Sequence, residues 1–378
     1  MARGVASLPA LDHPRERPEI VPAPAGPGGI VLVAAGPEIV GGQGTQAHAL
    51  LDALRRDGLE VAFLPVNPPF PRGLGWLRRR PYARTILNQA LYLPSLLRLR
   101  RAAVAHVFSA AYWSFLLGPV PAMLAARAFG RRVVLHYHSG EAGDHLARWG
   151  ILVHPFLRLA DVIVVPSPYL QGVFARHGLR VLVIPNVVDT ARFRYRDRVP
   201  LRPRLLSARN LEPYYRVDTT LRMFALLRER FPEATLVVAG GGGEEARLRA
   251  LARDLGERGI RFAGRVEPRQ MPALYDGADI FVNASIVDNQ PVSVLEAFAA
   301  GLPVVTTPTG DIATLVREGQ TGLLVPPGDP ERMAGAVASL VVDPARARAM
   351  ARRAREVVER YTWAAVKEAW RAAYREIP

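Results

Sequence analysis

The segment SIVDNQPVSVLEAFAAGLPVV, residues 285–305, contains the signals that decide the fold. Pro291 suits the first turn of a helix and Gly301 suits the position just past a helix end. Residues 292–300 are therefore predicted to form a helix of about two and a half turns. The Val-Val pair that closes the segment favours a strand, which places the helix between strands of a parallel sheet. The turn before the helix offers unpaired N–H groups and the positive end of the helix dipole, a favourable seat for an anion.

Two acidic residues flank this anion seat. Asp288 precedes the predicted helix and Glu296 lies inside it. The pair can therefore hold two ends of one ligand whose charged middle lies at the helix tip. An acid in a short apolar helix is costly unless it is paired, which favours a functional role for Glu296. Asp288 has an alternative interpretation as the N-terminal cap of the helix.

The composition indicates a two-domain protein of the cytoplasm. The chain has 378 residues and is 49% hydrophobic, which is sufficient for two cores. It contains no cysteine, so disulfides, thiolate catalysis and cysteine-ligated metals are excluded, as is typical of a reducing compartment. The net charge of +15 predicts attraction to phosphates, anionic lipid or nucleic acid. Residues 1–28 are rich in proline and glycine, lack the apolar core of a secretory signal, and are predicted to be a flexible tail.

Strand-like and helical patterns alternate in both halves of the chain. This alternation predicts an α/β fold of two doubly wound, Rossmann-like domains that face a cleft. The first domain is expected over residues 29–195 and the second over residues 196–358, followed by an amphipathic helix within residues 359–378. The longest uncharged run, residues 102–126, is interrupted by glycine and proline. It is interpreted as two buried elements, with a transmembrane helix as the alternative.

A glycine-rich loop follows the first predicted strand. Residues 29–35 read as a buried strand and residues 45–57 have helical apolar spacing, so residues 36–44 are expected to form a loop between them. In this loop, Gly41 and Gly42 let a backbone approach a phosphate or a sugar closely. The loop has neither a Walker motif nor the Gly-x-Gly-x-x-Gly pattern of nicotinamide-binding proteins. A tight turn without a ligand is the equal alternative.

Polar residues follow two further strands. His136 and His138 lie on one face of a strand whose carboxyl end is polar, where parallel α/β sheets bind their ligands. One of the two is expected to be a site residue and the other to be packed. A third ligand is missing nearby and the chain has no Asp-x-Asp motif, so no metal is expected. Arg209 follows the first strand of the second domain, where it can neutralise a diphosphate, with Arg216 as a second candidate.

A long basic segment lies in the first half of the chain. Residues 61–140 contain no acidic residue and eleven arginines, and the arginines in residues 72–101 are interleaved with aromatic residues and leucines. This pattern favours a helix that lies on an anionic membrane surface, with an ordinary solvated surface as the alternative. No nucleic-acid-binding motif accompanies the charge. We therefore predict a peripheral protein on the inner face of the plasma membrane.

Taken together, these motifs resemble those of the retaining, nucleotide-sugar-dependent glycosyltransferases of family 4, which have the two-domain GT-B fold. The resemblance covers about residues 30–374 and is carried by these motifs: Gly41-Gly42, Ala160-Asp-Val-Ile-Val-Val-Pro-Ser167, Ile184-Pro-Asn-Val-Val-Asp189 with Phe193, Arg209, Gly240 to Glu244, Phe262-Ala-Gly264, Leu274-Tyr with Ala278-Asp279, and Asp288 to Val305. It implies transfer of a sugar from a nucleotide diphosphate donor to an acceptor, with retained anomeric configuration and no cofactor. The implied acceptor is a lipid-linked or cell-envelope glycan, as in polysaccharide biosynthesis.

The resemblance also implies roles for the candidate site residues. The first domain lies on the acceptor side, the second domain binds the donor, and the last helix crosses back to the first domain. Glu296 would hold the nucleotide ribose, Asp288 would meet the hydroxyl groups of the transferred sugar, and His138 would lie near the acceptor and the anomeric carbon. The remaining candidate donor contacts are Gly41, Gly42, Arg209, Arg216, Gly264, Asn289, Gln290, Pro291, Val292 and Ser293.

The chain departs from the family pattern at three places. Asp288 replaces the usual glutamate, and Tyr214 and Tyr215 stand where a lysine is expected. Residues 309–313 read Thr-Gly-Asp-Ile-Ala in place of Gly-Gly-x-x-Glu, which moves or removes a charge near the donor. Two other functions are alternatives to sugar transfer. A nucleotide-sugar epimerase on the same fold would need a second acid/base set in the cleft, and a non-catalytic, degenerate transferase acting as a binding scaffold would account for the missing lysine and glutamate.

Overall fold

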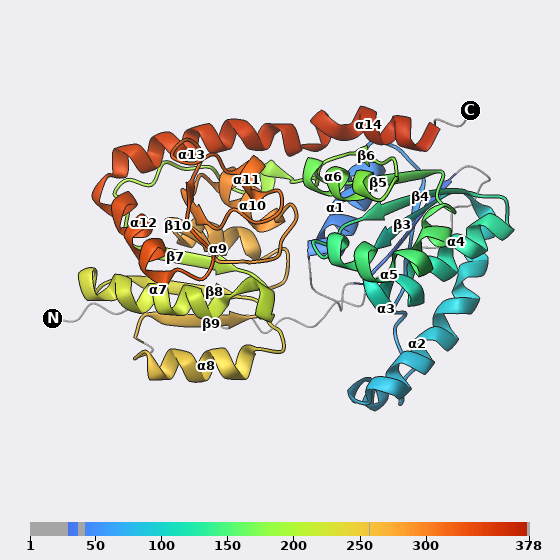
Figure 1. Cartoon of the computed structure of the whole chain (residues 1–378), viewed down its shortest axis with the longest axis horizontal. Coiled ribbons are helices and arrows are strands. Elements are labelled where there is room, and N and C mark those ends of the chain that lie inside the picture. The colour runs from blue at the N-terminus through green and yellow to red at the C-terminus, as the bar shows by residue number, and fades with distance from the viewer. Residues whose placement is uncertain (1–28, 37–41, 257, 376–378) are drawn as a thin grey trace.

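A computed structural model describes residues 29–36, 42–256 and 258–375 and contains two α/β units side by side (Figure 1). The predicted tail at residues 1–28 and the glycine Gly41 lie outside the described residues. Each unit is built on a six-stranded sheet in which neighbouring strands are parallel. The prediction of two doubly wound α/β units is thereby confirmed.

The first sheet has the strand order β2-β1-β3-β4-β5-β6. Its strands are β1 Gly29–Ala34, β2 Val61–Pro65, β3 Ala102–Ser109, β4 Arg132–Tyr137, β5 Val162–Val165 and β6 Leu182–Val183. The helices that follow them are α1 Gly42–Arg56, α2 Pro81–Ser95, α3 Tyr112–Leu117, α4 Pro119–Ala128, α5 Ala142–Leu157 and α6 Pro168–Arg176. Helix α1 begins at Gly42, three residues before the predicted start, so Gly42 and Gly44 belong to the helix and not to the loop.

The second sheet has the strand order β12-β11-β10-β7-β8-β9. Its strands are β7 Arg204–Ala208, β8 Thr235–Ala239, β9 Ile260–Gly264, β10 Ile280–Asn283, β11 Val304–Thr306 and β12 Leu323–Leu324. Its helices are α7 Val217–Arg230, α8 Glu245–Asp254, α9 Met271–Gly277, α10 Val292–Ala300, α11 Ile312–Leu315, α12 Pro330–Val342 and α13 Pro344–Val358. In both sheets the strand order reverses next to the first strand of the unit, and a doubly wound sheet binds its ligands at such a point.

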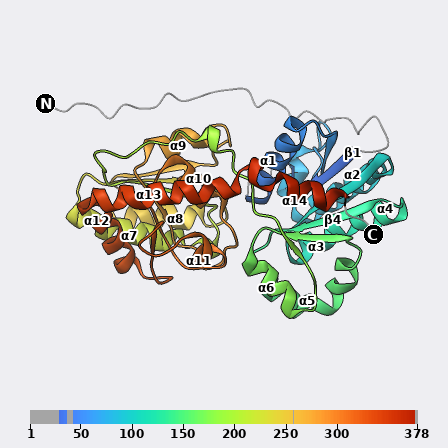
Figure 2. The ribbon, with the colours of Figure 1, turned by 90° about the horizontal axis from the view of Figure 1, so that it is seen from above.

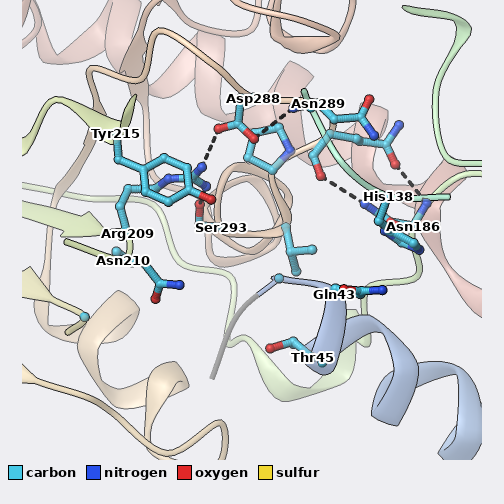
Figure 3. Close-up of a pocket in the computed structure, with 18 of the residues that line it drawn as sticks. Gln43, Thr45, His138, Asn186, Arg209, Asn210, Tyr215, Asp288, Asn289 and Ser293 are labelled. Carbon is cyan, nitrogen blue, oxygen red and sulfur yellow. Dashed lines mark hydrogen bonds and ion pairs between the residues drawn. The ribbon is translucent and has the colours of Figure 1, made fainter. Parts of the chain in front are cut away.

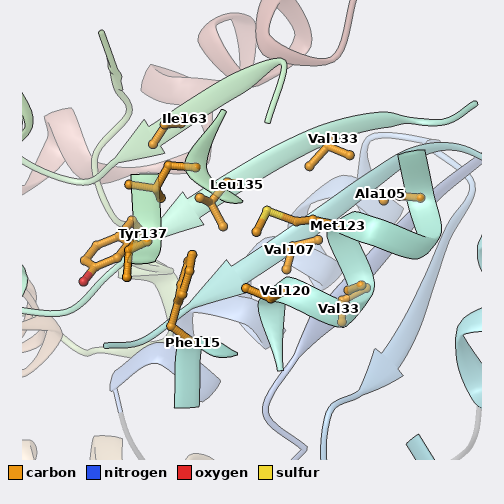
Figure 4. Close-up of a cluster of buried hydrophobic side chains, with 14 of the residues drawn as sticks. Val33, Ala105, Val107, Phe115, Val120, Met123, Val133, Leu135, Tyr137 and Ile163 are labelled. Atoms are coloured by element: carbon orange, nitrogen blue, oxygen red, sulfur yellow. The ribbon is translucent and has the colours of Figure 1, made fainter. Parts of the chain in front are cut away.

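Both sheets are covered on their two faces, as parallel sheets require. Along β1, Val31 and Val33 point into one apolar cluster, while Ile30 and Leu32 point into another. Figure 4 shows the first of these clusters, where Phe115 and Met123 from α3 and α4 pack on the sheet. The uncharged run at residues 102–126 is thus a buried strand followed by two short helices. Within the described residues, no helix combines the length and the apolar character needed to cross a bilayer.

The C-terminal helices join the two units. Helix α13 packs on the second unit, and α14, Trp363–Arg375, continues over the first one (Figure 2). Val366, Trp370 and Ala373 of α14 are buried in the apolar cluster on the first sheet. The linker before β7 is tied down by Arg198, which is 1% exposed and donates to the carbonyl oxygens of Tyr275 and Ala300.

Candidate active site

A cavity of about 470 Å³ lies between the two units, next to the points where the strand orders reverse. The loops after β1, β3, β7 and β10 all contribute to its wall (Figure 3). Of the site residues predicted from the sequence, those that line the cavity are Gly42, His138, Arg209, Asp288, Asn289, Gln290, Pro291, Val292, Ser293 and Glu296. The fold therefore brings most of the predicted site together.

Helix α10 has the predicted bounds, and its N-terminal turn faces the cavity. Pro291 precedes the helix in an extended conformation, and Gly301 ends it with φ of 73°, a left-handed value that glycine adopts without strain. In the described structure, the N–H groups of Val292 and Ser293 have no acceptor within the protein. These groups and the helix dipole make the turn a seat for an anion, as the sequence predicts.

Arg209 lies over this turn and is held there from three sides. Its guanidinium donates to Asp288 Oδ2 at 2.5 Å and to Ser293 Oγ at 3.2 Å, and its Cζ atom lies 4.0 Å from the ring centre of Tyr215. Asp288 also accepts from the Ser285 hydroxyl at 3.2 Å and from the Asn289 N–H at 3.0 Å. Burial raises the pKa of Asp288, and the Arg209 charge opposes this rise. Arg209 is thus preorganised to add positive charge to the anion seat.

Glu296 lies further along α10, on the same wall of the cavity. The Tyr275 hydroxyl donates to Glu296 Oε2 at 2.8 Å and is also within 3.1 Å of the Ser293 carbonyl oxygen. Burial raises the pKa of Glu296 to about 7, although the Tyr275 hydrogen bond lowers it. A partly desolvated carboxylate with one protein partner can accept hydrogen bonds from vicinal hydroxyl groups, such as those of a ribose.

The side chains of Asn289 and Gln290 point across to the first unit, which the sequence does not predict. Asn289 Oδ1 accepts from the Ser167 hydroxyl at 2.5 Å. Gln290 accepts from the Asn186 N–H at 2.8 Å and donates to the Pro166 carbonyl at 2.9 Å. The side chains of Asn289 and Gln290 therefore hold the two units together, and the backbone of these residues faces the cavity.

Gln290 also reaches Asp311, which lies in the segment that departs from the family pattern. Gln290 Nε2 lies 3.1 Å from Asp311 Oδ2, and the Asp311 N–H donates to the Asn289 carbonyl at 3.0 Å. Burial raises the pKa of Asp311 to about 6. The Asp311 carboxylate thus lies outside the cavity wall and supports Gln290, whose side chain bonds to the first unit.

His138 lies in the cavity wall and is backed by a row of buried rings. Its ring centre is 4.0 Å from that of His136. His136 Nδ1 is 3.3 Å from His106 Nε2, and His106 Nδ1 is 2.9 Å from the Tyr374 hydroxyl of α14. Burial lowers the pKa of both His106 and His138 to about 3, so these rings are neutral. As expected, one histidine of the pair faces the cavity and the other is packed.

Two predicted donor contacts do not line the cavity. Arg216 adopts a left-handed backbone conformation, with φ of 46°, and its guanidinium pairs with Asp218 at 3.0 Å. It therefore does not replace the missing lysine in this structure. Gly264 accepts a hydrogen bond from the Gly240 N–H at 2.8 Å, and the residues after it, Arg265 and Val266, reach the cavity in its place.

Several cavity residues were not predicted. Arg192, Arg265, Asn186 and Glu141 all line the cavity. The available signal for Arg265 was its position directly after β9, at the carboxyl edge of the sheet. Two of the glycines at 240–243 have a structural cause, because a Cβ atom on Gly240 would lie 2.0 Å from the Arg209 carbonyl oxygen and one on Gly242 would lie 2.3 Å from the Leu211 carbonyl oxygen. Across the described part of the chain, no three His, Cys, Asp or Glu residues are close enough to hold a metal ion.

Comparison with solved structures identifies the fold. The chain superposes on a sucrose-phosphate synthase from Thermosynechococcus elongatus with a TM-score of 0.73 at 20% identity, over 92% of this chain and 98% of that one. Anabaena HepE, solved with UDP and glucose, gives a TM-score of 0.70 at 18% identity, over 90% and 98% of the two chains. The fold is therefore the GT-B fold of two Rossmann-like domains.

Sequence comparison then identifies the family. Residues 40–192 match the family model "Glycosyltransferase Family 4", and residues 195–357 match "Glycosyl transferases group 1". A GDP-mannose-dependent alpha-(1-6)-phosphatidylinositol monomannoside mannosyltransferase of Mycolicibacterium smegmatis is 33% identical over 64% of this chain and 68% of its own. The Mycobacterium tuberculosis enzyme of the same name is 32% identical over 70% and 75% of the two chains. The chain belongs to the family 4, group 1 glycosyltransferases and is a nucleotide-sugar glycosyltransferase.

Proposed function

We propose that the protein transfers a sugar from a nucleoside diphosphate donor to a lipid-linked or cell-envelope glycan, with retention of the anomeric configuration and without a metal or other cofactor. The observation that carries this proposal is the position of Arg209 over the open N-terminal turn of α10, with Glu296 on the same helix. A diphosphate at the turn would meet Arg209 and the N–H groups of Val292 and Ser293. Glu296 would then accept hydrogen bonds from the ribose hydroxyl groups.

In the proposed reaction, the bond between the sugar C1 atom and the diphosphate oxygen breaks while a bond to the acceptor oxygen forms. The departing diphosphate carries the electron pair, and the acceptor proton passes to it or to solvent. Stabilising that negative charge is the main catalytic task, and it falls to Arg209 and the helix tip. Asp288 is held by Arg209, Ser285 and the Asn289 N–H. These contacts favour a role for Asp288 in orienting the sugar over one as a covalent nucleophile.

The proposal is tested with purified protein and a set of nucleotide sugars that begins with GDP-mannose, the donor named for two relatives. We expect one donor to be bound and slowly hydrolysed without an acceptor, and NMR of the glycoside formed with an acceptor to show retained configuration. Glu296→Ala should abolish donor binding. The proposal fails if no nucleotide sugar is bound or consumed, or if Glu296→Ala leaves binding unchanged.

We further propose that the first domain rests on the anionic inner face of the plasma membrane through residues 72–101. Helix α2 extends away from the rest of its domain (Figure 1). Tyr82, Ile86 and Leu93, which share one face of α2, are 87%, 71% and 50% exposed. Exposed apolar residues beside arginines in an acid-free segment suit the boundary between acyl chains and anionic headgroups.

Flotation with vesicles tests the membrane proposal. The protein should float with phosphatidylglycerol vesicles at low salt, less well at high salt, and not with phosphatidylcholine vesicles. The double variant Tyr82→Glu with Ile86→Glu should stay in solution. Leu182→Glu, at an exposed position on β6, is the matched control and should float like the unchanged protein. Salt-independent binding, or equal loss in the control, would contradict the proposal.

A further inference from the structure

The positive charges of the cavity lie on one side only. The described arginines in its wall are Arg209 and Arg265 of the second domain and Arg192, which lies near the end of the first domain. Arg192 also donates to the Pro268 carbonyl of the second domain. Apart from Arg192, which is bonded to the second domain, the described first-domain part of the wall contains no arginine or lysine. A phosphate bound on the first-domain side would therefore have no cation beside it.

The first-domain wall instead offers neutral hydrogen-bonding groups. Gln43, Thr45, Ser114 and Ser139 line it together with small alanine and glycine residues. The imidazole of His138 is buried and neutral, since burial lowers its pKa to about 3. Hydroxyl, amide and imidazole groups without a formal charge match the hydroxyl groups of a sugar.

One negative charge adds to this pattern. Glu141 is exposed and lines the cavity at the N-terminus of α5. The pKa of Tyr214, on the opposite wall, is raised mainly by burial, and the charge of Glu141 adds to this rise together with Tyr215 and Glu212. The Glu141 carboxylate therefore acts across the opening between the domains. A like charge beside a phosphate disfavours binding unless a cation intervenes.

We propose that the acceptor presents an uncharged sugar to the first-domain wall, and that Glu141 and the absence of a described cation there exclude phosphorylated acceptors. This inference rests on the proposed function, because it concerns the second substrate of the same reaction. The two substrates thereby bind to different walls of one cavity. The second domain holds the negatively charged diphosphate of the donor, and the first domain holds the neutral acceptor. If the acceptor is attached to a lipid through phosphate, that phosphate lies outside the cavity.

The test uses neutral mono- and disaccharide glycosides and the phosphate monoester of each, with the donor that the protein consumes. Neutral glycosides should accelerate donor consumption at least about tenfold more than their phosphate esters. The inference is overturned if any ester equals its neutral parent, or if the donor is hydrolysed but no neutral glycoside accelerates its consumption. The proposed donor chemistry would still stand in both cases. If the donor is neither bound nor hydrolysed, the proposed function fails and the inference fails with it.

A variant that removes the charge of Glu141 tests whether this charge, and not another feature of the acceptor, causes the preference for neutral glycosides. Glu141→Gln should lower the ratio of KM for the phosphate esters to KM for the neutral glycosides by about threefold or more. Higher salt should reduce the difference between KM for the phosphate esters and KM for the neutral glycosides in the unchanged protein. Glu356→Gln, at an exposed position of α13 that does not line the cavity, makes the same change in net charge and should alter neither value. Equal effects of the two variants would overturn the role of Glu141.

Discussion

Replacement of Glu296 by glutamine should stabilise the ligand-free protein and weaken donor binding. Glu296 is a partly desolvated acid whose side chain accepts a hydrogen bond from Tyr275 at 2.8 Å. Burial raises its pKa to about 7 from the ordinary value of 4.5. Because the folded state holds the proton more tightly than the unfolded state does, folding is opposed whenever the solution forces this group to ionise. Glutamine keeps the acceptor oxygen for Tyr275 and removes the charge.

The size and direction of the effect follow from the difference between the two pKa values. A difference of about 2.5 units corresponds to about 3 kcal/mol of unfolding free energy, and all of it is lost when the pH exceeds the folded value. Glu296→Gln should therefore stabilise the protein by about 3 kcal/mol at pH 8.5 and by about 1 kcal/mol at pH 5. Asp288 and Asp311 also have raised pKa values, but both are present in each protein and cancel in the comparison.

Urea unfolding of the unchanged protein and the variant at both pH values measures this difference, and calorimetric titration with the nucleoside diphosphate measures binding. Glu356→Gln on the outer face of α13 is the control and should change neither quantity. If Glu296→Gln stabilises the protein equally at pH 5 and pH 8.5, the carboxylate is not desolvated in the way described. If the variant binds the nucleotide as well as the unchanged protein does, the ribose contact is refuted.

Three further variants test other parts of the site. Arg209→Lys should lower kcat about tenfold or more, because an ammonium group cannot span the two partners of the guanidinium; steady-state transfer kinetics that match the unchanged enzyme would contradict this. Gln290→Leu removes hydrogen bonds between the domains, each worth about 1–3 kcal/mol when its buried partner is left unpaired, so the radius of gyration by X-ray scattering should increase. An unchanged radius would show that Gln290 does not hold the domains together. Tyr374→Phe should lower kcat about threefold at constant KM, because the ring row behind His138 loses its anchor. Tyr92→Phe removes a buried, hydrogen-bonded hydroxyl that does not line the cavity and should leave kcat unchanged; equal effects would indicate a purely structural role.

Much of the fold could be predicted because the chain marks its elements with strong local signals. Proline and glycine bracket α10, so its predicted and observed bounds agree. The start of α1 was placed three residues late, because glycines at 42 and 44 suggest a loop although tertiary packing keeps them helical. Strand β12 contains only Leu323 and Leu324, which is too short to produce a periodic pattern.

The site could be predicted only where its residues follow the ends of strands. Arg209 and Asp288 each follow a strand of the second sheet, and the carboxyl edge of a parallel sheet is where ligands bind. The cross-domain bonds of Gln290 depend on how the two sheets are placed, and no local pattern encodes that placement. Arg216 was wrongly grouped with Arg209 because its left-handed backbone conformation, which directs the guanidinium to Asp218, leaves no signature in the sequence.

The structure shows how residues 309–313, which depart from the family pattern, contribute to the contact between the two domains. Asp311 does not line the cavity; it lies beside Gln290 and accepts its hydrogen bond. The turn at residues 288–291 is consequently fixed from behind by Asp311, from across the cleft by Asn186, and from the front by Arg209. A ligand that binds its backbone meets a turn that is already ordered, so less binding energy is spent on ordering it. Because the Asn186 contact joins the domains, opening the cleft would also remove one support of the anion seat.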